Sequence, residues 1–382
     1  MARIYHYTFI LFVNFIILKY KLFIIIQRPK KVKKSIAALP YYPQNWPGGA
    51  DRIAAWKPYF EKEDINFNVF WAWEADELRK YFEYTKAKNQ IKRYKLFFRL
   101  LNRRWGQLNQ ILQHDTIWIQ RAFLPLYPFK KTYFEKLLHK LHPNVIYDFY
   151  DADYESNYNL VMQTVRNASK VTVASEFLKE KFKQYNKSTH FVRFAIRKEQ
   201  FVTQPDRGKG TDTVKIGWMG SPDNAKQLLH IAGQLQKIEN EYPQVKFSFV
   251  CRDLPELGLK RAEVQKWGEE GFDYYHWLAS LDVGLVPFIK QTDRQKAKIS
   301  MKCLEFMGNG ISLISSPNIH ADQLEDGKSF LLANENDWFE KIKLLIERPE
   351  LRKKLGQKGK NIFYDYHTYE AVYPVLKEIL LG

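Results

Sequence analysis

Residues 214–224 read Val-Lys-Ile-Gly-Trp-Met-Gly-Ser-Pro-Asp-Asn, and this stretch decides the fold of the second half of the chain. The run is largely apolar up to Met219, turns at Gly220, and leads into a helical pattern over 224–241. A strand that ends in a glycine turn before a helix is the opening of a parallel α/β unit. Glycine at such a turn lets a ligand approach the backbone, and amides at a helix start favour phosphate. The sequence lacks a P-loop and a GxGxxG motif, so a purely steric role for the glycine stays open.

Similar strands extend in both directions along the chain. Residues 203–213 contain no apolar side chain apart from Pro205 and carry two glycines, which indicates a domain boundary. We therefore predict an α/β protein with two doubly wound, Rossmann-like domains that face each other across a cleft. Strands are expected at 35–39, 66–71, 116–120, 145–149, 171–174 and 190–193, and then at 214–219, 245–251, 283–287 and 311–315. The predicted division is an N-terminal segment at 1–33, a first domain at 34–202, a linker at 203–213, a second domain at 214–365 and a final helix at 366–382.

The positive charge of the chain is concentrated in two patches. The 382 residues carry a net charge of +18. Residues 1–34 hold eight basic and no acidic residues, and residues 79–104 hold ten basic residues and one acid, Glu83. The remainder is nearly neutral, so a polyanion wrapped around the whole surface is not required. Cys251 and Cys303 are the only cysteines, which suits a reducing compartment and excludes a disulfide scaffold. No Cys/His cluster has zinc-ligand spacing, so we expect no metal site.

The N-terminal segment is apolar over residues 9–26. Its length approaches that of a membrane span, but Lys19 and Lys21 lie near its middle. No small-residue cleavage site follows, and the basic cluster at 30–34 would keep the following chain in the cytoplasm. A membrane anchor or membrane-lying segment, a dispensable extension and a core element all remain open. We expect a cytoplasmic protein at the inner face of the plasma membrane.

Residues 77–113 are expected to form a basic amphipathic helix rich in aromatic side chains. Such a helix is typical of docking on anionic lipid headgroups. It is also compatible with a helix packed on its own domain whose basic face is solvated. Nucleic acid is a weaker alternative, because the aromatic residues follow a helical period and not an exposed strand platform. The recurring apolar and aromatic positions are Tyr81, Tyr84, Ile91, Tyr94, Phe98, Leu101, Leu108 and Leu112.

Two further segments carry charged side chains where strands end. Five cations follow the apolar strand of 283–287, where they would neutralise a diphosphate without a metal or form a solvated loop. Glu305 would accept ribose hydroxyls or pair with Lys302 three residues earlier. Three acids at 148–153 suit a metal, acid–base chemistry or a helix cap. The five cations are Lys290, Arg294, Lys296, Lys298 and Lys302, and the acids are Asp148, Asp151 and Asp153.

Four segments of the second half, in this order, resemble the nucleotide-sugar domain of retaining GT-B glycosyltransferases, the broad group that builds bacterial polysaccharides and glycolipids. The first half is similar to that group in weaker ways, and the resemblance covers roughly residues 34–375. The segments are KIGWMGSPDN at 215–224, LASLDVGLVPF at 278–288, KISMKCLEFMGNGISLISSP at 298–317 and DGKSFLLANENDWFEKIKLLIERPELRKKLGQKGK at 326–360, with DTIWIQR at 115–121, VIYDFYDAD at 145–153 and VASEFLKEKF at 173–182 in the first half.

The resemblance implies a role for individual residues. Glu305 would bind the ribose of the donor, Tyr274 in the turn 272–275 would meet the base, and the helix 366–382 would cross back onto the first domain. Gly220 and Ser221 would approach the donor diphosphate, Gly48 and Gly49 would form a glycine loop facing the donor, and Asp151 would be a polar residue on the acceptor side. The cations expected at the diphosphate are Lys226, Lys298 and Lys302.

The implied activity is sugar transfer from a nucleoside-diphosphate sugar to a glycan or lipid-linked acceptor, with retention and without a metal or other cofactor. The chain departs from the family where a Glu often precedes the ribose carboxylate by eight positions, since Ala297 stands there. A catalytically weak, nucleotide-sugar-binding homologue is therefore an alternative. A basic nucleic-acid-binding protein is the other alternative, although no nucleic-acid partner is expected. The expected partners are the donor, the acceptor and an anionic membrane surface contacted by residues 1–34 and 79–104.

Overall fold

The computed structural model describes residues 33–127, 132–202, 213–288, 292–297, 300–317 and 323–382. The chain divides into two compact units, one of Met1–Phe194 with Val372–Gly382 and the other of Ala195–Ala371. The hydrophobic segment expected at 1–33 lies outside the described residues except for its last residue, and so does the linker expected at 203–213. No described helix combines the length and the apolar composition that crossing a membrane requires.

The first unit is built on a parallel six-stranded sheet in the order β2-β1-β3-β4-β5-β6. Its central strands are buried on both faces, as their apolar sequences require. The strands are β1 Ser35–Leu39, β2 Asn66–Val69, β3 Thr116–Gln120, β4 Val145–Phe149, β5 Lys170–Val173 and β6 Thr189–Phe191. The helices are α2 Pro47–Ala50, α3 Lys57–Glu61, α4 Glu77–Lys86, α5 Gln90–Ile111, α6 Tyr133–Leu141, α7 Tyr158–Asn167 and α8 Glu176–Lys183.

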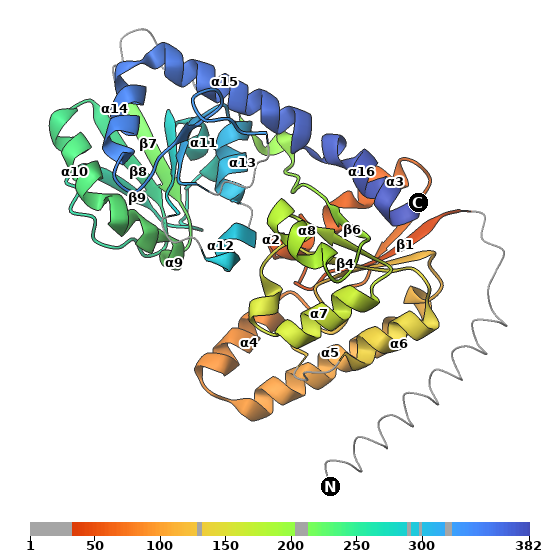
Figure 1. Ribbon diagram of the computed structural model, residues 1–382. Helices are drawn as coiled ribbons and strands as arrows, with labels where there is room; N and C mark the ends of the chain where they lie inside the picture. Colours follow the sequence, from red (N-terminus) through yellow and green to blue (C-terminus); the bar gives the residue numbers. More distant parts are fainter. Residues whose placement is uncertain (1–32, 128–131, 203–212, 289–291, 298–299, 318–322) are drawn as a thin grey trace. The chain divides into compact units, whose positions relative to one another are not determined.

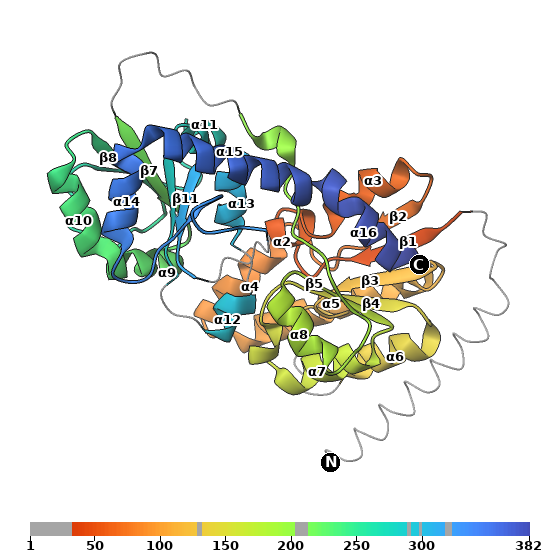
Figure 2. The same cartoon turned by 45° about the horizontal axis from the view of Figure 1, so that its top comes forward.

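Helices cover both faces of this sheet. The last helix, α16 Tyr369–Leu381, packs beside α3, and the rings of Phe60 and Tyr373 lie 5.0 Å apart. Its carboxyl end also reaches the sheet, since Thr116 Oγ1 donates to the Leu380 carbonyl at 2.8 Å. Figures 1 and 2 show α3 with α16 on one side of the sheet and α5 with α6 on the other. This division follows from right-handed crossovers, because the chain reverses its direction across the sheet after β2.

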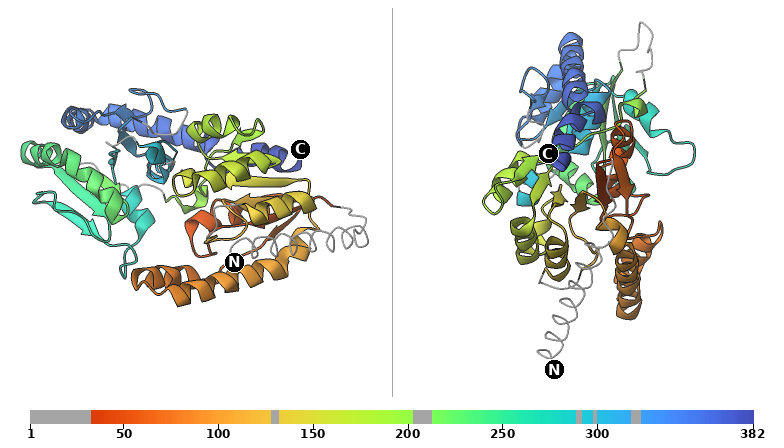
Figure 3. Two further views of the ribbon diagram at one scale, coloured as in Figure 1. Left: turned by 60° about the horizontal axis from the view of Figure 1, so that its bottom comes forward. Right: turned by 90° about the vertical axis from the view of Figure 1, so that its right-hand side faces the viewer.

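The helix expected over 77–113 is in fact two helices, α4 and α5, which Figure 3 shows in orange along the outside of the first unit. The break falls at Lys88, whose φ is +51°, and the side chain of Asn89 caps the start of α5 by accepting from Lys92 N. A residue in the left-handed region ends a helix, so the two segments cannot be continuous.

Two neighbouring arginines, of which Arg104 is buried, fasten α5 to the rest of the first unit. Arg104 has no exposed surface, and its guanidinium donates to the carbonyls of Pro40, Phe70 and Phe123 at 3.1, 2.6 and 3.0 Å. Burial lowers the pKa of Arg104 to about 9. Arg103 pairs with Glu77 at 2.8 Å and so joins α5 to α4. The interpretation of 77–113 as a helix packed on its own domain is therefore correct for one face.

The second unit repeats the architecture with a parallel sheet in the order β12-β11-β10-β7-β8-β9. The confirmed fold class is thus α/β with two doubly wound sheets. The short strands β9 and β12 were not predicted, because β9 (Ala-Glu-Val-Gln) is polar and exposed, and β12 has only two residues. The strands are β7 Val214–Met219, β8 Val245–Val250, β9 Ala262–Gln265, β10 Val283–Val286, β11 Ser312–Ser315 and β12 Leu331–Leu332. The helices are α9 Pro222–Ala225, α10 Ala232–Glu241, α11 Tyr274–Ala279, α12 Asp293–Ala297, α13 Met301–Gly308, α14 Trp338–Glu347 and α15 Pro349–Tyr366.

Candidate nucleotide-sugar site

Gly220 lies at the carboxyl end of β7, where the strand order of the second sheet reverses between β7 and β10. Ligands of doubly wound sheets bind at this switch point. The backbone of Gly220 lies beside the ammonium group of Lys302 on α13, because a Cβ atom on Gly220 would come within 2.8 Å of Lys302 Nζ. The same ammonium sits 4.3 Å from the centroid of the Trp218 ring. Glycine therefore leaves space at the turn for a cation that the sheet and α13 hold in place.

An aromatic pair closes the other side of this turn. Trp267 donates from Nε1 to the Gly220 carbonyl at 3.3 Å, and its ring lies 4.9 Å from the ring of Tyr274. Tyr274 opens α11, where Asp273 caps the helix by accepting from the amides of Tyr275 and His276. Trp267 remains 41% exposed, so one aromatic surface is open to a ligand.

Glu305 completes the group from α13. Burial, and then the neighbouring carboxylate of Glu305, raise the pKa of the Tyr274 hydroxyl well above its ordinary value. Glu305 and Lys302 are both half-buried and lie three residues apart on the same helix. The structure thus gathers a cation, a carboxylate and two aromatic rings around one glycine turn. We call Gly220, Trp267, Tyr274, Lys302 and Glu305 the β7-end cluster.

The other residues predicted for the diphosphate contribute less to this cluster. Ser221 is exposed and accepts from the Asn224 amide at 3.4 Å, which makes it the cap of the four-residue helix α9. Lys226 forms an exposed ion pair with Asp223 at 3.0 Å. Lys298 and Lys290 lie outside the described residues. Ala297, which replaces the expected Glu, is fully buried at the end of α12.

The predicted glycine loop of the first unit is a short helix. Gly48 and Gly49 lie within α2, after the carboxyl end of β1, and the Gly48 carbonyl accepts from Gln120 Nε2 at 2.6 Å. A Cβ atom on Gly48 would come within 2.7 Å of the Tyr150 hydroxyl, and one on Gly49 would come within 2.7 Å of the Tyr42 carbonyl. Close packing therefore requires both glycines, whether or not they face a ligand.

Asp151 belongs to a charged group around Arg121. Arg121 follows β3 with a φ of +62°, and its guanidinium lies 3.5 Å from Asp151 Oδ2 and 3.1 Å from Asp153 Oδ1. These two carboxylates, together with Tyr42 and Tyr150, hold the pKa of Arg121 above its ordinary value against the effect of burial. A left-handed conformation is uncommon outside glycine, and it marks the end of β3 as a strained position.

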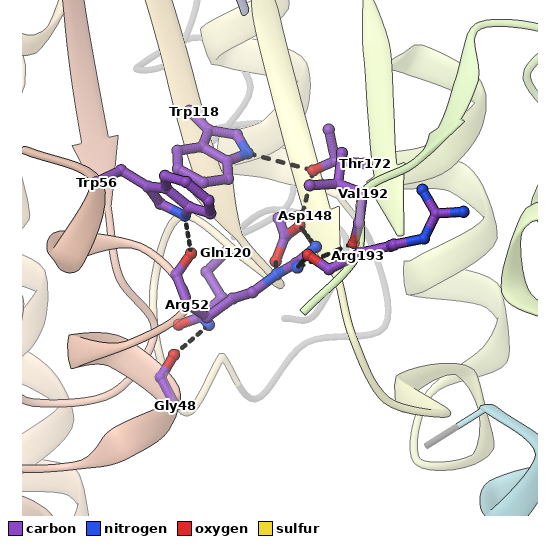
Figure 4. Close-up of polar contacts among 9 residues, drawn as sticks. All are labelled: Gly48, Arg52, Trp56, Trp118, Gln120, Asp148, Thr172, Val192 and Arg193. Carbon is purple, nitrogen blue, oxygen red and sulfur yellow. Dashed lines mark hydrogen bonds and ion pairs between the residues drawn. The ribbon is translucent and has the colours of Figure 1, made fainter. Parts of the chain in front are cut away.

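Asp148 has a structural role. Arg52 contacts it with two nitrogens, Nη2 to Oδ1 at 2.7 Å and Nε to Oδ2 at 3.1 Å, and both side chains are at most 2% exposed. Thr172 Oγ1 donates to the same carboxylate at 2.7 Å, and Arg52 also donates to the Val192 carbonyl at 3.1 Å (Figure 4). A buried charge pair with all these partners ties β4 to the turn after α2, to β5 and to the residue that follows β6. Asp148 lies within β4 and its carboxylate accepts from Arg52 and Thr172, so the helix-cap interpretation of Asp148 is wrong, while acid–base chemistry by this residue stays a prediction.

Three residues of these groups were missed in the sequence. Trp267 stands in a polar loop between β9 and α11, and its signal was a tryptophan beside Gly268 and Gly271, both of which have positive φ. Arg121 was quoted only as the end of a strand, although cations at strand ends were recognised elsewhere. Arg52 gave no signal, because a pairing across 96 residues leaves no local pattern.

The two cysteines lie outside the β7-end cluster. Cys251 and Cys303 are buried and form no disulfide, Cys251 Sγ donates to the Asp253 carbonyl at 3.3 Å, and burial raises the pKa of the Cys303 thiol to about 12. Within the part of the chain that the structure describes, no group of three His, Cys, Asp or Glu side chains has the arrangement of a metal site.

The sequence of the second unit matches a known family. Residues 230–378 match the model of the family described as glycosyl transferase-like. These residues contain α11, α13 and the tail that carried the resemblance in the sequence. No curated protein matches this chain.

Solved structures with the same fold cover nearly the whole chain. The HepE protein of Anabaena, determined with UDP, has a TM-score of 0.60 and 14% identity, and the match covers 91% of this chain and 99% of HepE. Sucrose-phosphate synthase from Thermosynechococcus elongatus has a TM-score of 0.65 and 11% identity, with 91% and 98% covered. A glycosyltransferase from Rickettsia africae has a TM-score of 0.64 and 12% identity, with 92% and 100% covered. The resemblance to the GT-B fold is thus confirmed for this chain, and residues 230–378 carry the match to the glycosyl transferase-like family.

Proposed function

We propose that the chain transfers a sugar from a nucleoside-diphosphate sugar to a glycan or lipid-linked acceptor. The observation that carries the proposal is the β7-end cluster, in which Lys302, Glu305 and Tyr274 meet at the Gly220 turn. The cation, the carboxylate and the aromatic rings of the cluster suit the diphosphate, the ribose and the base of such a donor, respectively. The proposed nucleotide is UDP, because HepE, which shares the fold, was determined with UDP and with UDP-glucose.

In this proposal the donor is bound by complementary chemistry along the cluster. The ammonium of Lys302 neutralises the diphosphate where the glycine backbone allows close approach. The carboxylate of Glu305 accepts the two ribose hydroxyls, and the exposed ring of Trp267 beside Tyr274 provides an apolar face for the base. Lys302 supplies the positive charge at the leaving group, so we propose that a metal is not needed.

The proposed reaction retains the configuration of the sugar. The bond from the sugar C1 to the diphosphate oxygen breaks, and C1 forms a new bond to the acceptor hydroxyl oxygen. The acceptor proton passes to the departing diphosphate oxygen, so the products are the glycoside and the nucleoside diphosphate. Preorganised positive charge from Lys302 stabilises the departing group. Asp151, oriented by Arg121 at 3.5 Å, contributes a hydrogen-bond acceptor on the acceptor side.

Turnover distinguishes this enzyme from a binding protein of the same fold. The protein is incubated with UDP-glucose and EDTA, and the release of UDP by transfer or slow hydrolysis is measured. We expect UDP release that depends on Lys302, so that Lys302→Met loses most of the rate. Binding of the donor with no UDP release by any preparation supports instead the catalytically weak homologue.

We also propose that the first unit docks on an anionic membrane surface at the cytoplasmic side. Ile91, Tyr94 and Phe98 on α5 are 71%, 59% and 57% exposed, although a second apolar stripe of the same helix, which includes Leu96, Phe97 and Leu100, packs inward. Packing within the unit therefore does not account for the outer apolar side chains. They lie among the ten basic residues of 79–104, which combines apolar insertion with charge attraction. Residues 1–34, the other expected contact, lie almost entirely outside the described part of the chain.

A further inference from the structure

A row of aromatic rings in the first unit begins at Tyr42, beside Arg121, and has no role in the function proposed above. The ring of Tyr42 is stacked on that of Trp46 with centroids 6.2 Å apart and planes at 10°. The ring of Trp46 lies 5.9 Å from that of Phe82. Tyr42 and Trp46 are half-buried, and Phe82 on α4 is 51% exposed. We call these three residues the aromatic strip.

The inner end of the strip lies where this sheet would hold a ligand. Tyr42 follows the carboxyl end of β1, and the strand order of the first sheet reverses between β1 and β3. The residue after β3 is Arg121, which donates to the Tyr42 hydroxyl at 2.6 Å and lies 5.1 Å from the centroid of its ring. The strip thus runs from the switch point of the first sheet outward to α4.

The charged side chains at the inner end of the strip indicate which class of ligand it can bind. One guanidinium, Arg121, faces two carboxylates, Asp151 and Asp153, whose side chains are 18% and 16% exposed. The group therefore carries no surplus of positive charge for a phosphate. Carboxylates beside aromatic faces match the two surfaces of a pyranose ring, because its C–H face is apolar and its hydroxyls donate hydrogen bonds. An alkyl chain would leave these carboxylates without new partners.

From this placement we propose that the aromatic strip binds the sugar rings of a neutral glycan acceptor. The inference rests on the proposed function, and it names the substrate class of the acceptor side. Sugar rings stack on Phe82 and on the part of Trp46 that Tyr42 leaves uncovered, Tyr42 supports Trp46 from behind, and the sugar ring nearest β1 donates hydroxyls to Asp151 and Asp153. Phe82 then extends the acceptor site beyond the reacting sugar, so longer acceptors bind more tightly than monosaccharides.

The test measures the binding of maltopentaose, cellopentaose, chitopentaose and mannopentaose to the full chain by saturation-transfer NMR and calorimetry, beside the binding of UDP. The unmodified protein binds at least one pentasaccharide more tightly than its monosaccharide. Phe82→Ser weakens that binding about three- to tenfold, as does Trp46→Leu, which keeps an apolar side chain without the ring. Phe98→Ser is the matched control, since Phe98 on α5 is 57% exposed, close to the 51% of Phe82, and lies outside the strip; its proposed membrane contact plays no part in an assay without vesicles.

Two results overturn the proposal. One is a protein that binds UDP and none of the pentasaccharides. The other is pentasaccharide binding that Phe82→Ser and Trp46→Leu leave within twofold of the unmodified protein. Pentasaccharide binding that depends on the strip in a protein that does not bind UDP would overturn the proposed function and leave the strip intact. UDP affinity serves in every variant as the measure of correct folding of the second unit.

Discussion

Glu305 is the side chain on which the proposed donor site depends most directly. It lies on α13, as Lys302 does, and its carboxylate contributes to raising the pKa of the Tyr274 hydroxyl. A carboxylate that accepts two ribose hydroxyls forms charge-assisted bonds, which are stronger than those of a neutral amide. The effect of the Glu305 charge on ribose binding can therefore be tested apart from the effect of the size and shape of its side chain.

Glu305→Gln keeps the size of the side chain and removes its charge. We expect UDP binding to weaken about tenfold or more, because hydrogen bonds to a charged group are worth about 1.5–3 kcal/mol. Calorimetric titration measures the change, and Glu340→Gln, an exposed position on α14, is the control. Equal UDP affinity of Glu305→Gln and the unmodified protein would exclude the ribose role.

At the scale of single elements, α6 carries a buried acid. Glu135 and His139 lie one turn apart on this helix, and Glu135 is 1% exposed. Burial raises the pKa of Glu135 to about 7 and lowers the pKa of His139 to about 4. The two groups therefore make the stability of the first unit depend on pH in opposite directions.

Glu135→Gln is expected to stabilise the first unit at neutral pH. The pKa of Glu135 is raised in the folded state, so its ionisation favours the unfolded chain between pH 4.5 and 7. At about 1.4 kcal/mol per pKa unit, the cost reaches about 3 kcal/mol near pH 7 and vanishes below pH 4.5. Calorimetric melting should show the advantage of Glu135→Gln growing from pH 4.5 to 7. A constant difference over this range would mean that Glu135 is not buried in this state.

The α5 helix leads to a prediction about membranes. Ile91→Ser, Tyr94→Ser and Phe98→Ser together should weaken binding to vesicles that contain anionic lipid, because they remove apolar side chains that insert between headgroups. Sedimentation with vesicles of phosphatidylcholine, with and without phosphatidylglycerol, measures the loss at low and high salt. UDP affinity should be unchanged. Binding that ignores both anionic lipid and these substitutions would contradict membrane docking by α5.

Some elements were predictable from the sequence and others were not, for physical reasons. The strands β1, β3 and β4 were predicted to the residue, because strands buried on both faces are continuous apolar runs. The break between α4 and α5 was missed, since Lys88 and Asn89 are ordinary helix-compatible residues in sequence. Gly220 was predicted from the turn that ends its strand and Glu305 from its place after a cation-rich segment, and the resemblance added their expected roles; Trp267 and Arg52 act through partners that the local sequence does not reveal.

At the scale of the whole molecule, the two units divide the proposed work. Each has its own doubly wound sheet and its own switch point, with the β7-end cluster in the second unit and the aromatic strip in the first. The final helix begins in the second unit and ends in the first, where Lys170 Nζ donates to the Ile379 carbonyl at 2.8 Å. Binding of the donor should therefore slow amide exchange in the second unit, and binding of the acceptor should slow it in the first.

Hydrogen exchange can map that division. Saturating UDP should slow amide exchange in the turn after β7, in α11 and in α13, because binding stabilises the elements that hold the ligand. The amides of β1, β3 and β4 in the first unit should exchange at the same rate with and without UDP. Protection by UDP that is confined to the first unit would place the nucleotide elsewhere.

The most direct test of the central claim is calorimetric titration of the protein with UDP, GDP, ADP and CMP, each in the presence of EDTA. We predict selective binding of UDP with a dissociation constant in the micromolar range, abolished or strongly weakened in Lys302→Met. Binding of none of the four nucleotides would contradict the assignment of the β7-end cluster as the donor site. That result would leave the fold assignment unchanged and would contradict only the assignment of the donor site.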